Sequence, residues 1–174
     1  MSGITCALLL ITALAAQPLS LEVDRGAEAL VVQFKLAGEL PPSVESTLGS
    51  GLATEIDYTL RVYARRRLFP DRKLWKGVAK ASVTFDAVTG RFRCQMIVNG
   101  TTTVSREVDT AEAARRWLAA PPAVEIPLPH ARRGAFLRVR ARAVFSSGTA
   151  WLIFPSTEGT GWIEVHLEAS PDDT

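Results

Sequence analysis

Apolar and polar side chains alternate with a period of two along most of this chain, and this pattern limits the fold more than any other feature. In residues 55–65, the even-numbered side chains are apolar or tyrosine, and the odd-numbered ones are polar. A period of two is typical of a half-buried β-strand, because successive side chains point to opposite faces of the sheet. The alternation, or a short apolar run, predicts strands at residues 30–36, 55–65, 75–86, 92–98, 101–108, 124–128, 136–145, 151–154 and 162–167.

Turn residues join several of these strands into hairpins. Thr89-Gly90 separates the third and fourth predicted strands, and Asn99-Gly100 separates the fourth and fifth. Asparagine and glycine both tolerate positive φ, so Asn99-Gly100 is a strong hairpin signal. Pro127 and Pro129 indicate that residues 124–128 form an edge strand or an extended linker, because proline cannot donate a ladder hydrogen bond.

Two segments carry helical signals. Asp109 can cap a helix over residues 109–119, with Glu112 at the capping-box position. Prolines and a following glycine predict a short helical turn near residues 41–49. We therefore expect a mainly β fold: an antiparallel sandwich or bent sheet of about seven to nine strands, with the longer helix as a crossover or plug.

The N-terminal residues predict export. Residues 4–16 form an apolar run, and residues 1–20 contain no charged side chain. Roughly 20 apolar residues are needed to cross a bilayer as a helix, so this shorter run fits a signal peptide, with Ala13-Leu14-Ala15 as a cleavage pattern. The usual basic residues before the run are missing, and a buried first helix or an uncleaved anchor remain alternatives. We expect a signal peptide over residues 1–16, a flexible lead over 17–28, a single β-rich domain over 29–169 and an acidic tail over 170–174.

Cysteine content and charge narrow the compartment and the partners. Beyond the predicted signal peptide only Cys94 remains, so the domain has no internal disulfide, which suits a bacterial periplasm. The formal net charge is +2, which does not indicate nucleic-acid binding. The charges form blocks of alternating sign: residues 61–80 hold eight bases and one acid, and residues 132–142 hold five arginines and no acid.

The strongest functional candidate is the arginine series on strand 136–145. Arg138, Arg140 and Arg142 share one face of that strand, and Arg132 and Arg133 precede it. Guanidinium groups in a row repel one another unless an anion lies between them, and they bind phosphate or carboxylate in a bidentate manner. This pattern predicts an anionic partner, such as a lipid head group, a wall polymer or an acidic protein patch. The alternative is cross-strand ion pairing with Glu164 and Glu168 or with Glu55 and Asp57.

A second basic cluster surrounds the predicted turn at Phe69-Pro70-Asp71. A basic turn tip of this kind is suited to contact with a membrane surface or a protein partner, and a merely solvated turn is the alternative. Its members are Arg65, Arg66, Arg67, Arg72 and Lys73.

The residues that could support catalysis or metal binding are few. His130 lies in a predicted loop, while His166 shares a strand face with Glu164 and Glu168. We interpret that face as solvated or ion-paired, because no Cys/His cluster or helical His pair supports a metal site. Ser146-Ser147-Gly148 lacks the G-x-S-x-G pattern of a hydrolase nucleophile.

Cys94 alternates with apolar neighbours, which indicates a core residue. We therefore predict no catalytic, cofactor or metal site.

Four segments together resemble a known family. Val32–Leu52 follows the pattern V-x-F-x-L-x-G-x-L-P-x-x-V-x-x-x-L-x-S-G-L, and Ile56–Leu68 is a long strand rich in Tyr and Arg. Val83–Asp86 reads V-T-F-D, and Leu137–Arg142 reads L-R-V-R-A-R. In these features the chain resembles the exported bacterial proteins of domain-of-unknown-function family 4390. The resemblance implies an envelope location and a β-rich domain, and it carries no site residues.

Three functions follow as hypotheses. The first is an exported, periplasmic or envelope-associated domain, without enzymatic activity, that presents its basic strand face to an anionic component. The second is an accessory or sensory partner of a membrane protein, and the third is a hydrolase with a dispersed site. A polar cleft holding a histidine beside a serine or aspartate would favour the third hypothesis.

Overall fold

Ten strands and two helices make up the part of the chain that the computed structural model describes, which is residues 19–26, 28–66, 68–128, 136–147 and 158–168. The predicted signal peptide, the acidic tail and the predicted strand at 151–154 lie outside these residues. Among the described residues, no helix is long and apolar enough to span a membrane. The elements are β1 (Leu19–Arg25), β2 (Ala29–Leu36), α1 (Pro42–Leu48), β3 (Thr54–Ala64), β4 (Arg72–Asp86), β5 (Arg91–Val98), β6 (Thr101–Val108), α2 (Ala111–Ala119), β7 (Val124–Pro127), β8 (Leu137–Ser147), β9 (Glu158–Gly159) and β10 (Ile163–Leu167).

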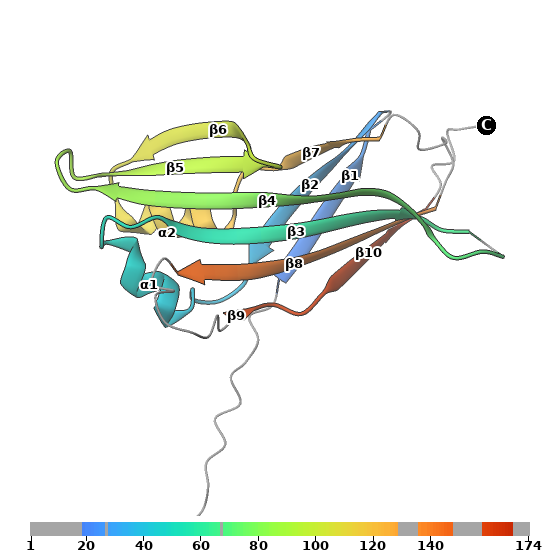
Figure 1. Cartoon of the computed structure of the whole chain (residues 1–174), viewed down its shortest axis with the longest axis horizontal. Coiled ribbons are helices and arrows are strands. Elements are labelled where there is room, and N and C mark those ends of the chain that lie inside the picture. The colour runs from blue at the N-terminus through green and yellow to red at the C-terminus, as the bar shows by residue number, and fades with distance from the viewer. Residues whose placement is uncertain (1–18, 27, 67, 129–135, 148–157, 169–174) are drawn as a thin grey trace, which may run out of the picture.

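The strands form two antiparallel sheets. The larger sheet has the order β10-β8-β3-β4-β5-β6, and the two-residue β9 pairs with the same edge of β8 as β10 does. The smaller sheet has the order β1-β2-β7 and crosses behind the larger sheet (Figure 1). The predicted antiparallel, mainly β fold is confirmed, and α2 is the predicted crossover, since it connects β6 of one sheet to β7 of the other.

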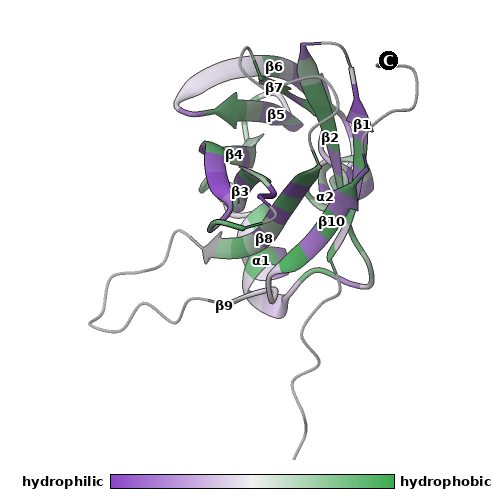
Figure 2. Cartoon of the chain, turned by 90° about the vertical axis from the view of Figure 1, so that its right-hand side faces the viewer, coloured by the Kyte–Doolittle hydropathy of each residue, from purple (hydrophilic) through white to green (hydrophobic). Residues whose placement is uncertain are grey.

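One face of the larger sheet is covered and the other is open. The smaller sheet and both helices lie on the same side of it (Figures 1 and 2). The buried side chains of β3, β4 and β8 point to this covered side, which we call the inner face, and their polar partners lie on the outer face.

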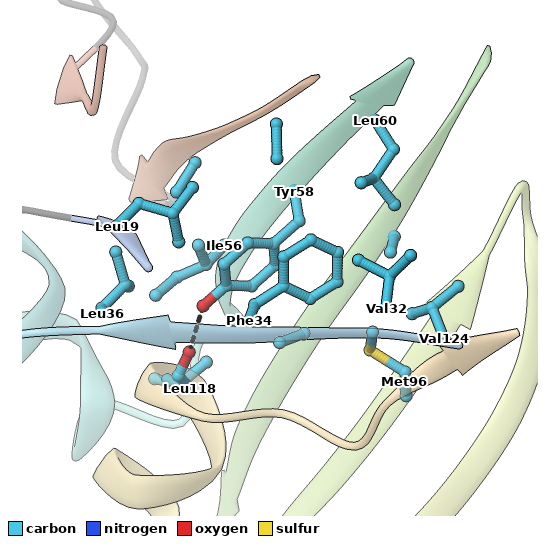
Figure 3. Close-up of a cluster of buried hydrophobic side chains, with 14 of the residues drawn as sticks. Leu19, Val32, Phe34, Leu36, Ile56, Tyr58, Leu60, Met96, Leu118 and Val124 are labelled. Atoms are coloured by element: carbon cyan, nitrogen blue, oxygen red, sulfur yellow. Dashed lines mark hydrogen bonds between the residues drawn. The ribbon is translucent and has the colours of Figure 1, made fainter. Parts of the chain in front are cut away.

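The core between the sheets is centred on two stacked rings. The rings of Phe34 on β2 and Tyr58 on β3 lie 4.6 Å apart between centroids. The Tyr58 hydroxyl donates a 2.7 Å hydrogen bond to the carbonyl oxygen of Leu118 on α2 (Figure 3). Burial raises the pKa of Tyr58 well above its usual value, so the phenol stays neutral and keeps this donor. One residue therefore links both sheets and the helix.

The small residues along the inner face of β4 have a bulky neighbour. Trp75 lies over Gly77, such that a Cβ atom added to the glycine would come within 2.2 Å of the indole. The Asn99 Oδ1 atom is also close to that position, and it accepts a hydrogen bond from the backbone N–H of Val78. Gly77 therefore makes room for both side chains.

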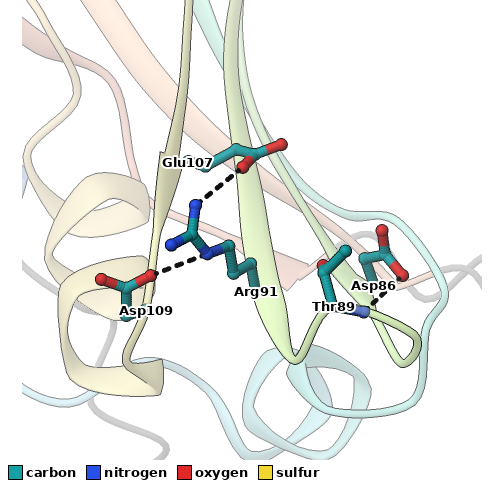
Figure 4. A network of polar contacts seen from close by, with 5 residues as sticks. All are labelled: Asp86, Thr89, Arg91, Glu107 and Asp109. Carbon is teal, nitrogen blue, oxygen red and sulfur yellow. Dashed lines mark hydrogen bonds and ion pairs between the residues drawn. The ribbon is translucent and has the colours of Figure 1, made fainter.

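Both predicted hairpins form. Asn99 and Gly100 have φ values of 50° and 85°, which closes the β5–β6 turn with two positive φ angles as expected. In the β4–β5 turn, the Asp86 carboxylate accepts hydrogen bonds from the backbone N–H groups of Val88 and Thr89. These bonds lower the pKa of Asp86, and Figure 4 shows the Thr89 contact.

The N-cap of the longer helix lies one residue later than predicted, and the helix itself begins at Ala111. Thr110, not Asp109, is its N-cap, and the Thr110 hydroxyl accepts a hydrogen bond from the N–H of Ala113. Asp109 instead forms an ion pair with Arg91 on β5, at 3.2 Å, and Glu107 approaches the same guanidinium at 3.5 Å (Figure 4). The prediction of Asp109 as the cap was wrong because two residues able to cap stand side by side, and tertiary pairing decides between them.

The prediction of a flexible lead over residues 17–28 is wrong for most of the residues in this range that the structure describes. Residues Leu19–Arg25 form β1, which pairs along its full length with β2. Leu19 is buried, and Leu21 and Val23 are half-buried against the core. Only three apolar residues carry the alternation here, which is too short a run to predict a strand from the sequence alone. The predicted edge strand at 124–128 is confirmed as β7.

Candidate functional site

The outer face of the larger sheet carries the predicted arginine series. On β8, Arg138, Arg140 and Arg142 are half-buried and alternate with fully buried residues such as Val139 and Ala141. The prediction of which side chains point inward on this strand is therefore confirmed. The same face receives outward side chains from β3, β4 and β10, which flank β8 or lie one strand further.

Strand pairing places further cations beside the arginines of β8, and the sequence pattern did not predict these neighbours. Arg61 on β3 lies directly opposite Arg140 on one side and Lys76 of β4 on the other. Glu164 on β10 lies opposite Arg140 at the end of the same row. The row therefore holds three cations and one carboxylate, and like charges directly opposite one another destabilise a sheet.

Trp162, just before β10, forms cation–π contacts with three of the arginines on this face. The guanidinium carbons of Arg61, Arg142 and Arg140 lie 4.6, 5.0 and 5.2 Å from the centroid of its ring. A cation over an indole face is stabilised by about 0.5–1 kcal/mol at exposed sites. We call Trp162, Arg61, Arg140 and Arg142 the Trp162 cluster, because one half-buried ring holds three positive groups together.

Only part of the arginine series is neutralised. Arg138 forms a 2.8 Å ion pair with Asp71, and Arg140 approaches Glu164 to 2.7 Å. Within the described ranges no carboxylate lies within 4 Å of Arg61 or Arg142. The Nε atoms of Arg61, Arg138, Arg140 and Arg142 are all buried without a hydrogen-bond partner. Two of the three arginines of β8 are thus ion-paired, through Glu164, which was an expected partner, and through Asp71, which was not.

Glu55 and Asp57, which were considered as partners for the arginines, form ion pairs with a lysine instead. Lys80 on β4 forms ion pairs with both carboxylates, and the hydrogen bond that its ammonium donates to Glu55 is the largest cause of its raised pKa. Burial raises the pKa of Asp57, and the neighbouring Lys80 opposes that shift. The outer face is therefore charge-balanced near the start of β3 and basic from Arg61 onward.

The basic end of the face leads to the β3–β4 hairpin tip, by which we mean the described residues 65, 66 and 68–73. The side chains of Leu68 and Phe69 are 86% and 69% exposed. Phe136, just before β8, is 53% exposed, and its carbonyl oxygen accepts a hydrogen bond from the backbone N–H of Arg65. The predicted basic tip is thus also apolar. Its exposed described cations are Arg65, Arg66, Arg72 and Lys73, and Arg67 lies outside the described residues.

The remaining predicted positions do not form a site in the described part of the chain. Arg132, Arg133 and His130 lie outside it. His166 is half-exposed and lies 3.9 Å from Glu164, and no group of three potential metal ligands is found among the described residues. Cys94 is fully buried in the core as expected, and burial raises the pKa of its thiol.

An open cleft of about 580 Å³, to which sequence reasoning gave no role, is lined by residues of β2, β6 and α2. Trp117 of α2 lies in its lining, with the Arg106 guanidinium 4.6 Å from the ring centroid. Lys35 and Arg116 also line the cleft. The stacked pair links α2 to the edge strand β6.

Comparison with known proteins identifies the family. The family model described as a domain of unknown function (DUF4390) matches residues 15–150. No curated protein and no solved structure matched the chain. The match covers β1 to β8, including most of the arginine face and the hairpin tip. This chain therefore belongs to the DUF4390 family.

Proposed function

We propose that this protein is an exported, non-enzymatic interaction domain that binds an anionic component of the bacterial envelope through the Trp162 cluster. The observation that carries this proposal is the arrangement of Arg61 and Arg142. Both guanidinium groups are drawn to one tryptophan ring while no described carboxylate neutralises them.

The charge of the cluster favours an anionic ligand. Glu164 is the one described carboxylate that pairs with it, against three guanidinium groups. Lys76 adds a further positive charge beside Arg61 in the same row. A bound anion would relieve the repulsion within this row, so part of its binding energy comes from strain already present in the free protein.

The geometry of the cluster favours a ligand with more than one negative group. Arg140 and Arg142 project from the same face of β8, about 7 Å apart along the strand. Guanidinium groups bind phosphate and carboxylate oxygens through paired N–H donors. Phosphate or carboxylate groups repeated along a polymer or crowded on a surface would therefore contact two arginines at once.

Binding of small polyanions tests the site. Inorganic tripolyphosphate serves as the phosphate probe and citrate as the carboxylate probe, and isothermal titration calorimetry measures their affinity for the full chain. Each charged hydrogen bond stabilises by about 1.5–3 kcal/mol, so Arg142→Gln should weaken binding roughly tenfold or more. Arg91→Gln is the matched control, because Arg91 is an exposed arginine of the same sheet outside the cluster.

Equal binding by wild type and by the Arg61→Gln/Arg142→Gln double variant would contradict the proposal. Preference for one probe over the other assigns the anion as phosphate or carboxylate. Salt dependence gives a further check, because an electrostatic site loses affinity as ionic strength rises.

Export is the second part of the proposal and is supported by the apolar run over residues 4–16 and the Ala13-Leu14-Ala15 pattern. The test is N-terminal sequencing of the protein recovered from the periplasmic and membrane fractions of a bacterial host. We expect the mature chain to begin near Gln17. An intact N-terminus recovered from the cytoplasmic fraction would contradict export.

A further inference from the structure

We propose that the β3–β4 hairpin tip is a membrane-docking element that inserts Leu68 and Phe69 into the surface of an anionic lipid bilayer. This inference goes beyond the proposed function, because it concerns a separate surface and does not require the Trp162 cluster. The partner is a lipid surface and not a small anion.

The first argument is exposure. Leu68 and Phe69 are 86% and 69% exposed, although each would bury much of its surface in an ordinary turn packed on a core. Phe136 lies at the start of β8, where its backbone is hydrogen-bonded to Arg65, and adds a second exposed aromatic ring. Leu68 and Phe69 are adjacent, and contiguous exposed apolar residues rimmed by polar ones mark protein or membrane interaction sites.

The second argument is charge complementarity. The apolar residues of the tip are flanked on both strands by exposed cations, and within the described ranges none of these forms an ion pair. Apolar side chains in the acyl region, with Lys and Arg at the level of the head groups, are the arrangement that binds anionic membranes. Each such cation adds to the attraction toward an anionic surface. The flanking cations are Arg65, Arg66, Arg72 and Lys73.

The third argument is rigidity. Asp71, in the turn, is held by its 2.8 Å ion pair with Arg138 of β8, and both side chains are mostly buried. Arg138 also lies 5.0 Å from the ring of Tyr63 on β3. The base of the tip is therefore fixed to the sheet, which lowers the conformational entropy lost when the tip enters a membrane.

The fold also offers a matched control at the opposite end of β4. Val88, in the β4–β5 turn, is 95% exposed, so it is another apolar residue at a hairpin end. Its turn contains the Asp86 carboxylate, and no cation lies between Asp86 and Gly90. Figure 1 shows the two hairpins at opposite ends of the sheet. Of these two ends, the β3–β4 end carries four exposed cations without a described ion pair, whereas Arg91 beside the β4–β5 turn is paired with Glu107 and Asp109.

A local fluorescent probe tests the inference in the full chain, because it reports on the tip whatever the N-terminal residues do. Tryptophan is introduced as Phe69→Trp or, in the control, Val88→Trp, and the wild-type spectrum is subtracted. Vesicles contain either phosphatidylglycerol or phosphatidylcholine, each with brominated acyl chains that quench inserted tryptophan. We expect a blue shift and quenching for Phe69→Trp on phosphatidylglycerol, with at least a several-fold weaker effect on phosphatidylcholine and for Val88→Trp.

Charge variants complete the test. In the Phe69→Trp chain, Arg72→Glu/Lys73→Glu should abolish the quenching, and circular dichroism confirms that these exposed substitutions leave the fold intact. Arg61→Gln/Arg142→Gln should leave the quenching in place, even though it removes small-anion binding. Equal quenching at positions 69 and 88, equal quenching on both lipids, or loss of quenching in the Arg61/Arg142 variant would each overturn the inference.

Discussion

Arg61 on β3 and Arg140 on β8 lie directly opposite one another in the larger sheet, and both guanidinium groups lie within 5.2 Å of the Trp162 ring centroid. Two like charges in this position oppose pairing of the strands, whereas the shared aromatic ring and Glu164 offset part of the repulsion. The stability of the free protein should therefore depend on the balance between this repulsion and these contacts.

Removal of Arg61 should change stability in a salt-dependent way. Arg61→Gln relieves repulsion with Arg140 and Lys76 but loses the contact with Trp162, so we expect a net change within about 1 kcal/mol. Salt screens the repulsion, so the repulsion is strongest at low salt. The stability of the variant relative to wild type should therefore increase as salt is lowered from 0.5 M to 0.02 M. Urea unfolding at both concentrations measures this difference, and a difference that is independent of salt would contradict the repulsive row.

Arg138 and Arg142 should differ in their importance for folding, although they lie on the same face of β8. Arg138→Gln leaves Asp71 mostly buried without its partner, and we expect a loss of about 1–3 kcal/mol. Arg142→Gln removes no described ion pair, only the contact with Trp162, and should change the free energy of unfolding by less than about 1 kcal/mol. Comparable losses for the two variants, measured by chemical denaturation, would show that the Asp71 contact is not the distinguishing feature.

Tyr58 should govern part of the alkaline limit of stability. Its buried phenol has a raised pKa, so its contribution is complete below about pH 10 and is lost at higher pH, where the unfolded chain ionises first. Tyr58→Phe should cost about 1–3 kcal/mol near neutral pH, because the Leu118 carbonyl loses its donor. It should also flatten the decline above pH 10. Lys80, whose pKa is raised by Glu55, also contributes stability that is lost as the pH rises. This contribution should be the same in wild type and in Tyr58→Phe.

Gly77 should not tolerate a side chain. A Cβ atom there would lie 2.2 Å from the Trp75 indole and 2.5 Å from Asn99 Oδ1. We expect Gly77→Ala to destabilise by about 1–3 kcal/mol, as overpacked sites do. Trp75→Leu in the same chain should recover part of that loss. Gly49→Ala is the control, since nothing lies within 4 Å of the corresponding position, and thermal unfolding of the four proteins gives the comparison.

The fold could be predicted largely from the alternation of side chains. In strands that bury one face, such as β3 and β8, the period of two predicts which side chains lie on that face. Asn99-Gly100 predicts its turn because both residues tolerate positive φ. β1 was missed because three apolar residues give too short a pattern. The helix cap was misplaced because the ion pair with Arg91 depends on the neighbouring strand.

The candidate site could be predicted only in part. Arg138, Arg140 and Arg142 share a face whatever their neighbours are, so spacing alone was enough to find them. The role of Arg61 follows from β3 pairing with β8, two strands far apart in the chain, and the role of Trp162 follows from the position of β10. The exposure of Leu68 and Phe69 is likewise a tertiary property, since their sequence is compatible with a packed turn.

The most direct test of the anion-binding account observes the arginine side chains themselves. The Nε–H resonances of a 15N-arginine-labelled full chain are followed by NMR while tripolyphosphate is added, with assignments from single Arg→Lys variants. We predict saturable shifts at Arg61 and Arg142, whose guanidinium groups form no ion pair with a described carboxylate, and little change at Arg91, which is paired with Glu107 and Asp109. Unchanged Arg61 and Arg142 resonances, or equal shifts at Arg91, would contradict the account.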